Sequence, residues 1–495
     1  MAKSPTLKQS LGQFFTPEQI VKYILENISL TSGNTIADIS CGNGAFLIQA
    51  FNELNKLKQD EISTLSQIYG IELSNSELNE AQKRILNHCR NKKCKSILKK
   101  NLLCMNTVTN TVEEILDVFP SIKQSSGFDV IVGNPPYVTI KIEKDLRKDH
   151  IFSQIISGQL NITTLMIGRA FSLLKCGGKL GLLLPKSLFR VSSYQKLRNF
   201  LLSYFEFDYL IDVGISFKGV RGEQVIFIGT KKNNPSSKKS VKIGTWYQNN
   251  SSKPSLNTVL QENIIRFGIF QFFDNPKTYA LTSKIIREHP SLESICNGKI
   301  YRGIPIGANS SFVTTIPKKG YKKALRGDSI KKFGFEYILY IKNQNYPKLT
   351  DEIQSKKIVV QNIFSAESGI IANYDDIGMI PLDTVTNIFP YHSEPHYVLG
   401  ILNSKLARFF MIFVVYAKSR LTMHTDKDYI GLLPIPKINS KLKDDIIKQV
   451  NFSLEGKKSN KIDELVFKAY GLSNEEKQLI DIELVRFERN GKKSK

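Results

Sequence analysis

The sequence lacks the segments that carry a chain into or across a membrane. Its opening stretch, MAKSPTLKQS, turns polar at once and has no apolar signal-peptide core. The longest late apolar run, from Phe409 to Ala417, is too short to span a bilayer. We therefore expect a cytoplasmic protein without a membrane partner, in which this run forms a buried helix or strand.

The sequence also lacks paired metal ligands. Its 6 cysteines are scattered and none forms a CxxC pair, which argues against a zinc ribbon or a disulfide framework and for a reducing compartment. His392 and His396 are close in sequence, but Pro395 lies between them, so a pair of loop residues is expected. We expect no metal site.

Acidic side chains are scarce relative to basic ones. The 495 residues include 69 Lys and Arg against 45 Asp and Glu, a formal net charge of +24. A field this positive favours a polyanionic partner, and a lysine-rich genome alone does not explain so large an excess. Apolar residues make up 41% of the chain, so we expect a globular protein with two or three domains.

What the first half of the sequence does contain is an alternation of helical and strand patterns. Ile20, Val21, Ile24 and Ile28 recur at helical spacing, while TIADIS, QIYGIEL and FDVIVG have the composition of short strands. Further helical and strand segments follow in turn. This alternation predicts a parallel α/β sheet with helices on both faces.

The amino-acid composition of the sequence changes between Lys231 and Leu260. This stretch is rich in Asn, Ser and Lys and has no Asp or Glu. Such segments commonly connect domains. We therefore predict a first domain over residues 1–232 and a second over 233–495, the second with short strands and a helical C-terminal segment.

A glycine turn, ADISCGNGAFL, ends the first predicted strand and opens a helix. Gly42 and Gly44 allow close approach of a ligand, and the following helix N-terminus favours an anionic group. A dinucleotide site would need glycine where Leu47 stands, so NAD and FAD are disfavoured. Glu72, which ends the strand in YGIEL, is placed to accept two ribose hydroxyls. S-adenosylmethionine (AdoMet) fits this pattern, although a tight turn without a ligand has it too.

The segment FDVIVGNPPYVTI places a rigid set of hydrogen-bond acceptors at the end of a strand. Ligands of open α/β sheets bind at this edge. The side-chain oxygen of Asn134 and the carbonyl of Pro135 can each accept one N–H of an exocyclic amine, such as N6 of adenine. Pro136 stiffens the loop, and Tyr137 offers a flat face for a base. The expected chemistry is positioning of a poor nucleophile before a methyl sulfonium.

The order of these motifs resembles that of the gamma-type, TaqI-like adenine-N6 DNA methyltransferases of restriction–modification systems. GQFFTPEQIVKYI is similar to the family's motif X, DISCGNG to motif I, GIEL to motif II, NLL to motif III and NPPY to motif IV. LLKCGGKLGLLLPKSL is similar to the stretch after motif V, and ISFKGVRGEQVIFIGT resembles motif VIII. The resemblance covers nearly the whole chain and is most specific before residue 230.

The resemblance implies a Rossmann-like AdoMet-dependent methyltransferase sheet followed by a mixed α+β target-recognition domain. Catalysis would fall to Asn134, Pro135, Pro136 and Tyr137. A flipped adenine would stack between Tyr137 and Phe217. The residues implied in cofactor binding are Gln13, Phe15, Thr16, Asp38, Cys41, Gly42, Gly44, Glu72, Asn101, Leu102 and Met166.

The sequence departs from the family pattern at several letters. Motif I usually reads DPACGSG, and here Ile39, Ser40 and Asn43 replace three of its residues. Motif III usually opens with Asp, where this chain has Asn101. An asparagine still accepts a hydrogen bond, but without charge, so a lower affinity for AdoMet is expected.

The resemblance also implies partners. We expect site-specific methylation of double-stranded DNA by a monomer in a prokaryotic, nucleoid-associated setting. A separately encoded restriction endonuclease remains open. Family members that cut DNA carry a nuclease ahead of motif X, and only about a dozen residues precede it here, so methylation without cleavage is expected.

Two other functions use parts of the same pattern. NPPY methyltransferases also act on a protein glutamine or an rRNA guanine, but those enzymes do not need a long basic second domain. An inactive DNA-binding specificity module would retain the basic domain, but it would not need NPPY, the glycine turn and Glu72 together. Both remain alternatives at this stage.

Overall fold

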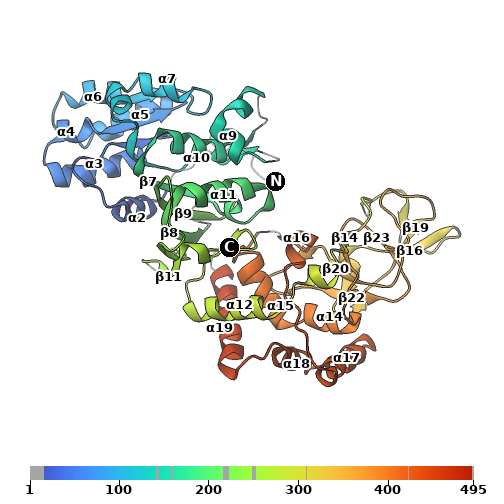
Figure 1. Cartoon of the computed structure of the whole chain (residues 1–495). Helices are drawn as coiled ribbons and strands as arrows, with labels where there is room; N and C mark the ends of the chain where they lie inside the picture. The colour runs from blue at the N-terminus through green and yellow to red at the C-terminus, as the bar shows by residue number, and fades with distance from the viewer. Residues whose placement is uncertain are drawn as a thin grey trace. The chain divides into compact units, whose positions relative to one another are not determined.

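The structure is a computed structural model that describes residues 16–140, 144–157, 160–215, 222–247, 252–307, 309–421 and 423–492. The chain divides into two compact units, Met1–Asp274 and Asn275–Lys495, which we call unit 1 and unit 2. Figure 1 shows the elements of both units, coloured along the chain. Gln13, Phe15 and Phe217, which the sequence assigns to the site, lie outside the described residues.

Among the described residues of unit 1, nine strands form a single sheet in the order β11-β10-β8-β9-β7-β4-β1-β2-β3. β4 pairs parallel with both β7 and β1, and β2 pairs parallel with both β1 and β3. β9 instead pairs antiparallel with both β7 and β8. This confirms the predicted parallel α/β sheet from β7 to β3, whereas β9 and β11 add antiparallel pairs that were not predicted. The strand bounds are β1 Ile36–Asp38, β2 Ile68–Glu72, β3 Leu102–Cys104, β4 Phe128–Gly133, β7 Leu174–Pro185, β8 Phe205–Gly214, β9 Gln224–Lys231, β10 Ser240–Thr245 and β11 Ser255–Leu260.

The helices of unit 1 bury amphipathic faces against this sheet. In α2 (Glu18–Ile28) the predicted apolar residues are all buried, and a Cβ on Gly181 of β7 would lie 2.6 Å from Cδ1 of Ile28. The glycine therefore lets the helix lie close to the strand. Further helices are α3 Ala45–Lys58, α4 Glu61–Leu65, α5 Asn75–Leu86, α6 Cys94–Asn101, α7 Val112–Asp117, α8 Pro120–Gln124, α9 His150–Ile155, α10 Ile162–Leu173 and α11 Gln195–Tyr204.

The boundary between the units differs from the predicted one at 232/233. The polar stretch after Lys231 is only a loop, because the chain returns to the sheet: β10 pairs parallel with β8, and β11 pairs antiparallel with β10. Val241 and Ile243 of β10 are fully buried. The composition of this stretch hid two strands. Unit 2 begins at Asn275, whose side chain caps α12 (Pro276–Glu288) by accepting from the amide of Lys277 at 3.0 Å.

Unit 2 is a mixed α+β structure, as predicted. Its larger strand groups follow the orders β14-β24-β20-β22 and β15-β19-β16-β23. These strands are β14 Ile300–Arg302, β15 Val313–Thr314, β16 Tyr321–Leu325, β19 Leu339–Lys342, β20 Lys357–Gln361, β22 Ala372–Asp375, β23 Ile380–Pro381 and β24 Val385–Ile388. The longer helices are α12 Pro276–Glu288, α14 Pro395–Leu402, α15 Lys405–Phe410, α17 Ser440–Leu454, α18 Ile462–Ala469 and α19 Asn474–Lys492.

The apolar run that begins at Phe409 lies in the helical part of unit 2. It continues α15 into a π-helical segment, Met411–Val415, whose residues are all buried. Within the described part of the chain, no single helix has the length and apolar character needed to cross a bilayer. A pair bent by 57°, Pro395–Leu402 with Lys405–Val415, meets that standard by length and composition alone.

Candidate active site

A cavity of about 460 Å³ lies at the carboxyl ends of β1, β2 and β4. Parallel strands of an open sheet end at a common edge, which is where ligands bind in such folds. Of the residues that the sequence assigns to the site, the cavity is lined by Thr16, Asp38, Cys41, Gly42, Glu72, Asn134, Pro136 and Met166. The segments predicted as motifs I, II and IV are thus brought together by the fold.

The glycine turn after β1 forms one wall of this cavity. Gly42 and Gly44 have φ values of +52° and +82°, which L side chains rarely adopt. Gly42 lines the cavity, whereas Gly44 faces α5, where an added Cβ would lie 3.1 Å from Cβ of Ala81. Gly42 is therefore placed to approach a ligand, and Gly44 allows α3 to pack against α5.

Glu72 is held in one orientation by backbone amides of two loops. Its Oε2 accepts a hydrogen bond from the amide of Gly42 at 2.8 Å, and its Oε1 accepts one from the amide of Ser74 at 3.0 Å. The residue is only 5% exposed. Because a carboxylate has about four acceptor positions, these two bonds leave capacity for ligand hydroxyls.

Asp38 is the second carboxylate of the cavity. Burial, opposed by a hydrogen bond from the amide of Ser40 and aided by the nearby charge of Glu72, raises the pKa of Asp38 to about 7. Gly133, at the end of β4, comes so close that an added Cβ would lie 2.8 Å from Oδ1 of Asp38. The two strand ends therefore meet at this carboxylate.

Asn134 follows β4 directly, and its side chain is fixed at both ends. Nδ2 donates to the hydroxyl of Thr16 at 3.1 Å, and Oδ1 accepts from the hydroxyl of Tyr137 at 2.5 Å. The Tyr137 hydroxyl also lies 3.1 Å from the carbonyl of Leu183 on β7. These contacts hold both ends of the amide, and they link the NPPY loop to the start of α2 and to β7.

The prolines of this loop have different surroundings. The carbonyl of Pro136 accepts a hydrogen bond from the hydroxyl of Thr163 at 2.7 Å, at the start of α10. Pro135 is buried, and neither it nor Tyr137 is among the residues that line the cavity. Burial raises the pKa of Tyr137 well above its ordinary value, so this hydroxyl is a donor at every working pH.

The structure does not place Asn101 and Leu102 at the cavity. Asn101 ends α6, and its Nδ2 donates to the carbonyl of Leu65 at 3.0 Å, while Leu102 is buried in the core. The cavity is lined instead by Met105 and Asn106, which follow β3. The position after a strand, at the edge shared with Asp38 and Glu72, was the signal that could have identified them.

Arg169 is a buried residue that the sequence analysis missed. It lies on α10 and is 3% exposed. Its guanidinium donates to the carbonyls of Thr107 and Val108, both at 3.1 Å, and pairs with Asp149 at 3.4 Å. Burial lowers the pKa of Arg169, and Asp149 opposes this shift. Arg169 thus fixes the segment that forms the cavity wall next to Asn106.

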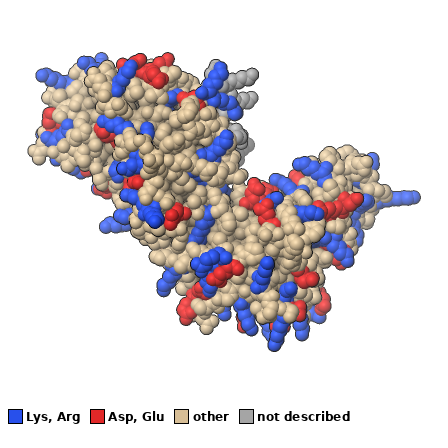
Figure 2. All heavy atoms as spheres, in the orientation of Figure 1, with Lys and Arg blue, Asp and Glu red and all other residues tan. Residues whose placement is uncertain are grey.

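Unit 2 carries exposed basic side chains around β16. Lys318, Lys319, Lys322 and Lys323 are all exposed, and we call them the β16 lysine cluster. Figure 2 shows Lys and Arg at the end of unit 2 that bears β16 and β19. Exposed lysines of this kind are available to the phosphates of a nucleic acid.

Two arginines of unit 2, Arg302 and Arg326, are already paired within the protein. Nε of Arg302 donates to the carbonyl of Asp383 at 2.7 Å, and its side chain is 50% exposed. Nε of Arg326 lies 2.5 Å from Oδ1 of Asp328. Both guanidinium groups are therefore engaged by groups of the chain itself, at the surface, where such contacts contribute little to stability.

Known families match two parts of the chain. Residues 66–218 match the family described as Eco57I restriction-modification methylase, and residues 322–435 match the TaqI-like C-terminal specificity domain. The first match contains β2, β4 and the NPPY loop. The second contains most of the strands of unit 2.

Curated relatives come from restriction–modification systems. The type II methyltransferase M.HincII of Haemophilus influenzae is 27% identical over 227 residues, which is 44% of this chain and 37% of that protein. The type I restriction enzyme MpnII methylase subunit of Mycoplasma pneumoniae is 30% identical over 132 residues, 26% of this chain and 22% of that one. The matches thus span 37% and 22% of the length of these two relatives.

The fold is similar to that of a solved restriction–modification enzyme. The type IIL enzyme MmeI, solved in complex with DNA, superposes with a TM-score of 0.60 at 16% identity, and the match covers 96% of this chain and 75% of that one. The likeness includes elements of both units. It supports the predicted architecture of an α/β sheet followed by a mixed α+β domain.

Proposed function

We infer that this chain, a member of the restriction–modification methyltransferases with an Eco57I-type methylase domain and a TaqI-like specificity domain, methylates N6 of adenine in double-stranded DNA. One observation carries the adenine assignment. Asn134 lines the cavity at the end of β4 and has its amide orientation fixed by Thr16 and Tyr137. An oriented amide oxygen suits the recognition of an amine.

The cavity fits AdoMet as methyl donor. Its volume of about 460 Å³ is in the range of small-molecule sites, and its walls are mostly apolar. Glu72 would hold the ribose hydroxyls, while Met105, Asn106 and Met166 would surround the rest of the nucleoside. When bound, AdoMet supplies an electrophilic methyl group on a sulfonium. The residues of the chain supply the orientation.

Asn134 would act on the acceptor amine. N6 of adenine is a poor nucleophile because its lone pair is delocalised into the ring. Oδ1 of Asn134 has two lone pairs, of which Tyr137 uses one, so it can accept an N–H bond as well. A second N–H would be accepted by the carbonyl of Pro135. These bonds draw the nitrogen toward tetrahedral geometry, and its proton leaves to solvent once the methyl group is transferred.

The target base would have to leave the helix. Acceptors at a cavity edge do not reach N6 inside a stacked duplex, so we propose base flipping, which costs a few kcal/mol. Stacking on an aromatic ring returns about 1–3 kcal/mol per base. Tyr137 and, from the family pattern, Phe217 would form the two faces of the sandwich.

Two observations favour this function over the alternatives. The specificity-domain match in unit 2 favours DNA over a protein glutamine or an rRNA base as the substrate. The cavity, with its oriented carboxylate and amide, favours an enzyme over an inactive DNA-binding module. A separate endonuclease and a monomeric state remain proposals of the same family resemblance.

The test is single-molecule sequencing of DNA from a methylation-deficient host that expresses the full chain. We expect N6-methyladenine at one recurrent sequence, and none in a host that expresses the Asn134→Ala variant. Methylcytosine at a recurrent site would contradict the adenine assignment. Unmodified DNA, together with AdoMet binding by calorimetry, would favour a non-DNA substrate.

A further inference from the structure

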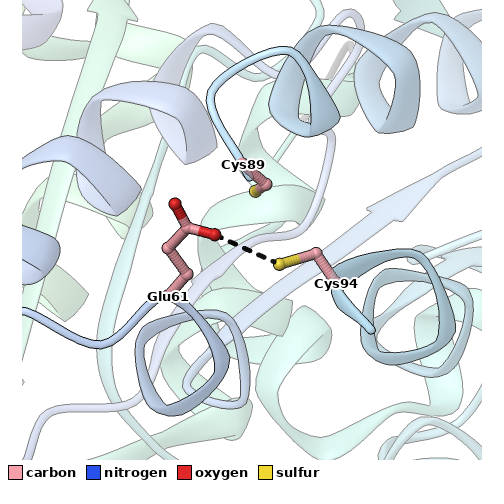
Figure 3. Close-up of side chains that lie close together, drawn as sticks. All are labelled: Glu61, Cys89 and Cys94. Atoms are coloured by element: carbon pink, nitrogen blue, oxygen red, sulfur yellow. Dashed lines mark hydrogen bonds between the residues drawn. The ribbon is translucent and has the colours of Figure 1, made fainter. Parts of the chain in front are cut away.

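We propose that Glu61, Cys89 and Cys94 form a binding site for a thiophilic divalent cation such as Zn²⁺ in unit 1, away from the cavity. One ligand atom from each residue lies within 4.8 Å of the others. Figure 3 shows the three side chains converging from separate segments. Glu61 begins α4, Cys89 follows α5 and Cys94 begins α6.

The distances suit a tetrahedral ion after a small contraction. A Zn–S distance of about 2.3 Å and a Zn–O distance of about 2.0 Å imply ligand atoms about 3.5–3.8 Å apart. Sγ of Cys94 already lies 3.8 Å from Oε2 of Glu61. Three protein ligands leave one position for water, as in zinc sites that are not closed by a fourth side chain.

The carboxylate is held in place by groups outside the cluster. Oε2 of Glu61 accepts hydrogen bonds from the backbone amides of Arg90 and Asn91, each at 2.9 Å. Hydrogen bonds to a ligating carboxylate are a regular part of metal sites, because they fix its direction.

The surrounding charges balance the ligand set. Two thiolates and one carboxylate exceed a divalent charge by one, and the connecting loop carries Arg90, Lys92 and Lys93, all exposed. Binding would release the two thiol protons to solvent as two metal–sulfur bonds form.

Local sequence spacing does not reveal this site. Cys89 and Cys94 have four residues between them instead of two, and Glu61 lies on a different helix. Cys94 is fully buried and Cys89 is half-buried, which leaves a path for an ion from solvent. A bound cation would join α4, α5 and α6 and so support β3, the strand that leads to the cavity wall at Met105.

The experiment is a Co²⁺ titration of the full, reduced chain in a phosphine reductant. We expect one Co²⁺ per chain, a near-ultraviolet thiolate-to-cobalt charge-transfer band, and displacement of this band by Zn²⁺. Cys94→Ser and Cys89→Ser should each abolish the band. Cys104→Ser and Cys176→Ser, which alter exposed thiols elsewhere, are the matched controls and should leave it unchanged.

Glu61→Gln tests the carboxylate separately, because the amide oxygen still accepts from Arg90 and Asn91. Its Co²⁺ affinity should fall at least tenfold. If the serine variants do not fold, alkylation of the wild-type chain followed by mass spectrometry gives the answer, since Zn²⁺ should protect Cys89 and Cys94 only. Absence of the band, its persistence in both serine variants, or a Cys89–Cys94 disulfide as the stable state would overturn the proposal. None of these readouts depends on methyl transfer.

Discussion

The hydroxyl of Tyr137 donates a hydrogen bond of 2.5 Å to Oδ1 of Asn134, the oxygen proposed to receive the target amine. The tyrosine therefore has two possible contributions: its ring can stack on a base, and its hydroxyl orients the amide. These contributions can be separated by substitution.

Asn134→Ala should lower the turnover of methyl transfer by about 10²–10³-fold, the usual cost of removing one oriented group at a transition state. AdoMet affinity should fall only modestly, because Glu72 and the β3 segment stay in place. Tritiated-methyl transfer and calorimetry measure the two effects. Turnover close to that of the wild type would refute the amine-orienting role.

Tyr137→Phe should reduce turnover by roughly 3–10-fold, since one neutral hydrogen bond is worth about 0.5–1.5 kcal/mol. Tyr137→Ala should cost more, because the stacking energy of about 1–3 kcal/mol is lost too. Fluorescence of 2-aminopurine at the target position reports flipping in both variants. If both substitutions lowered turnover equally, stacking of the base on the Tyr137 ring would contribute nothing.

Asn106→Ala should weaken AdoMet binding, whereas Asn101→Ala should leave it unchanged. Asn106 lines the cavity, and Asn101 contacts the carbonyl of Leu65 at the opposite end of β3. The two substitutions are chemically identical, so each controls for the other in a calorimetric titration. The reverse order of effects would favour the motif assignment made from the letters NLL.

Asp38→Asn should stabilise the protein at pH 8 and leave it nearly unchanged at pH 4. Burial raises the pKa of Asp38 from an ordinary 3.8 to about 7, so the folded chain binds more protons than the unfolded chain between these values. Stability from this group is thus lost as the pH rises from about 4 to about 7. A tenfold difference in the acid constant between the folded and unfolded chain corresponds to about 1.4 kcal/mol.

Melting curves of both proteins across this range provide the comparison. Other titrating groups contribute equally to wild type and variant, so only the difference in melting temperature matters. That difference should grow up to about pH 7 and then level off. A difference independent of pH would show that Asp38 is already ionised in the folded chain.

Replacing the four lysines of the β16 lysine cluster by Gln should flatten the salt dependence of DNA binding. The slope of log K against log salt should change by about 0.9 for each phosphate that the protein no longer neutralises. A matched control replaces four exposed lysines elsewhere in unit 2, Lys457, Lys458, Lys461 and Lys468. The same change in slope for both sets would mean that only net charge matters.

The sequence predicted the site residues best where a local motif directly follows a strand of the parallel sheet. The turns after β1, β2 and β4 were found because each follows a short apolar strand, and parallel strands must end at one edge. β3 has only three residues, so the letters NLL drew attention to its start rather than its end. A second partner of the Tyr137 hydroxyl, the carbonyl of Leu183, lies on β7, 46 residues away, and only the folded sheet brings it there.

Arg169 is a residue whose role the sequence pattern did not predict. Within TLMIGRAFSLL it has the appearance of a charged interruption in an apolar helix, and its three acceptors come from segments 20 to 62 residues away. Composition likewise concealed β10 and β11, because their apolar residues alternate with Lys, Asn and Ser. For Arg169 and for β10 and β11, the structural role follows from burial and hydrogen-bond pairing in the folded chain.

The pairing of β10 with β8 has a consequence for exchanging recognition modules between relatives. A junction placed at residue 232 would strip β8 of β10, one of its two neighbours, and leave the backbone groups of Tyr209–Asp212 on that side unpaired. An open strand of this kind invites association with other chains. A junction at Asp274–Asn275 keeps the sheet whole and lets the incoming module start at its own helix cap.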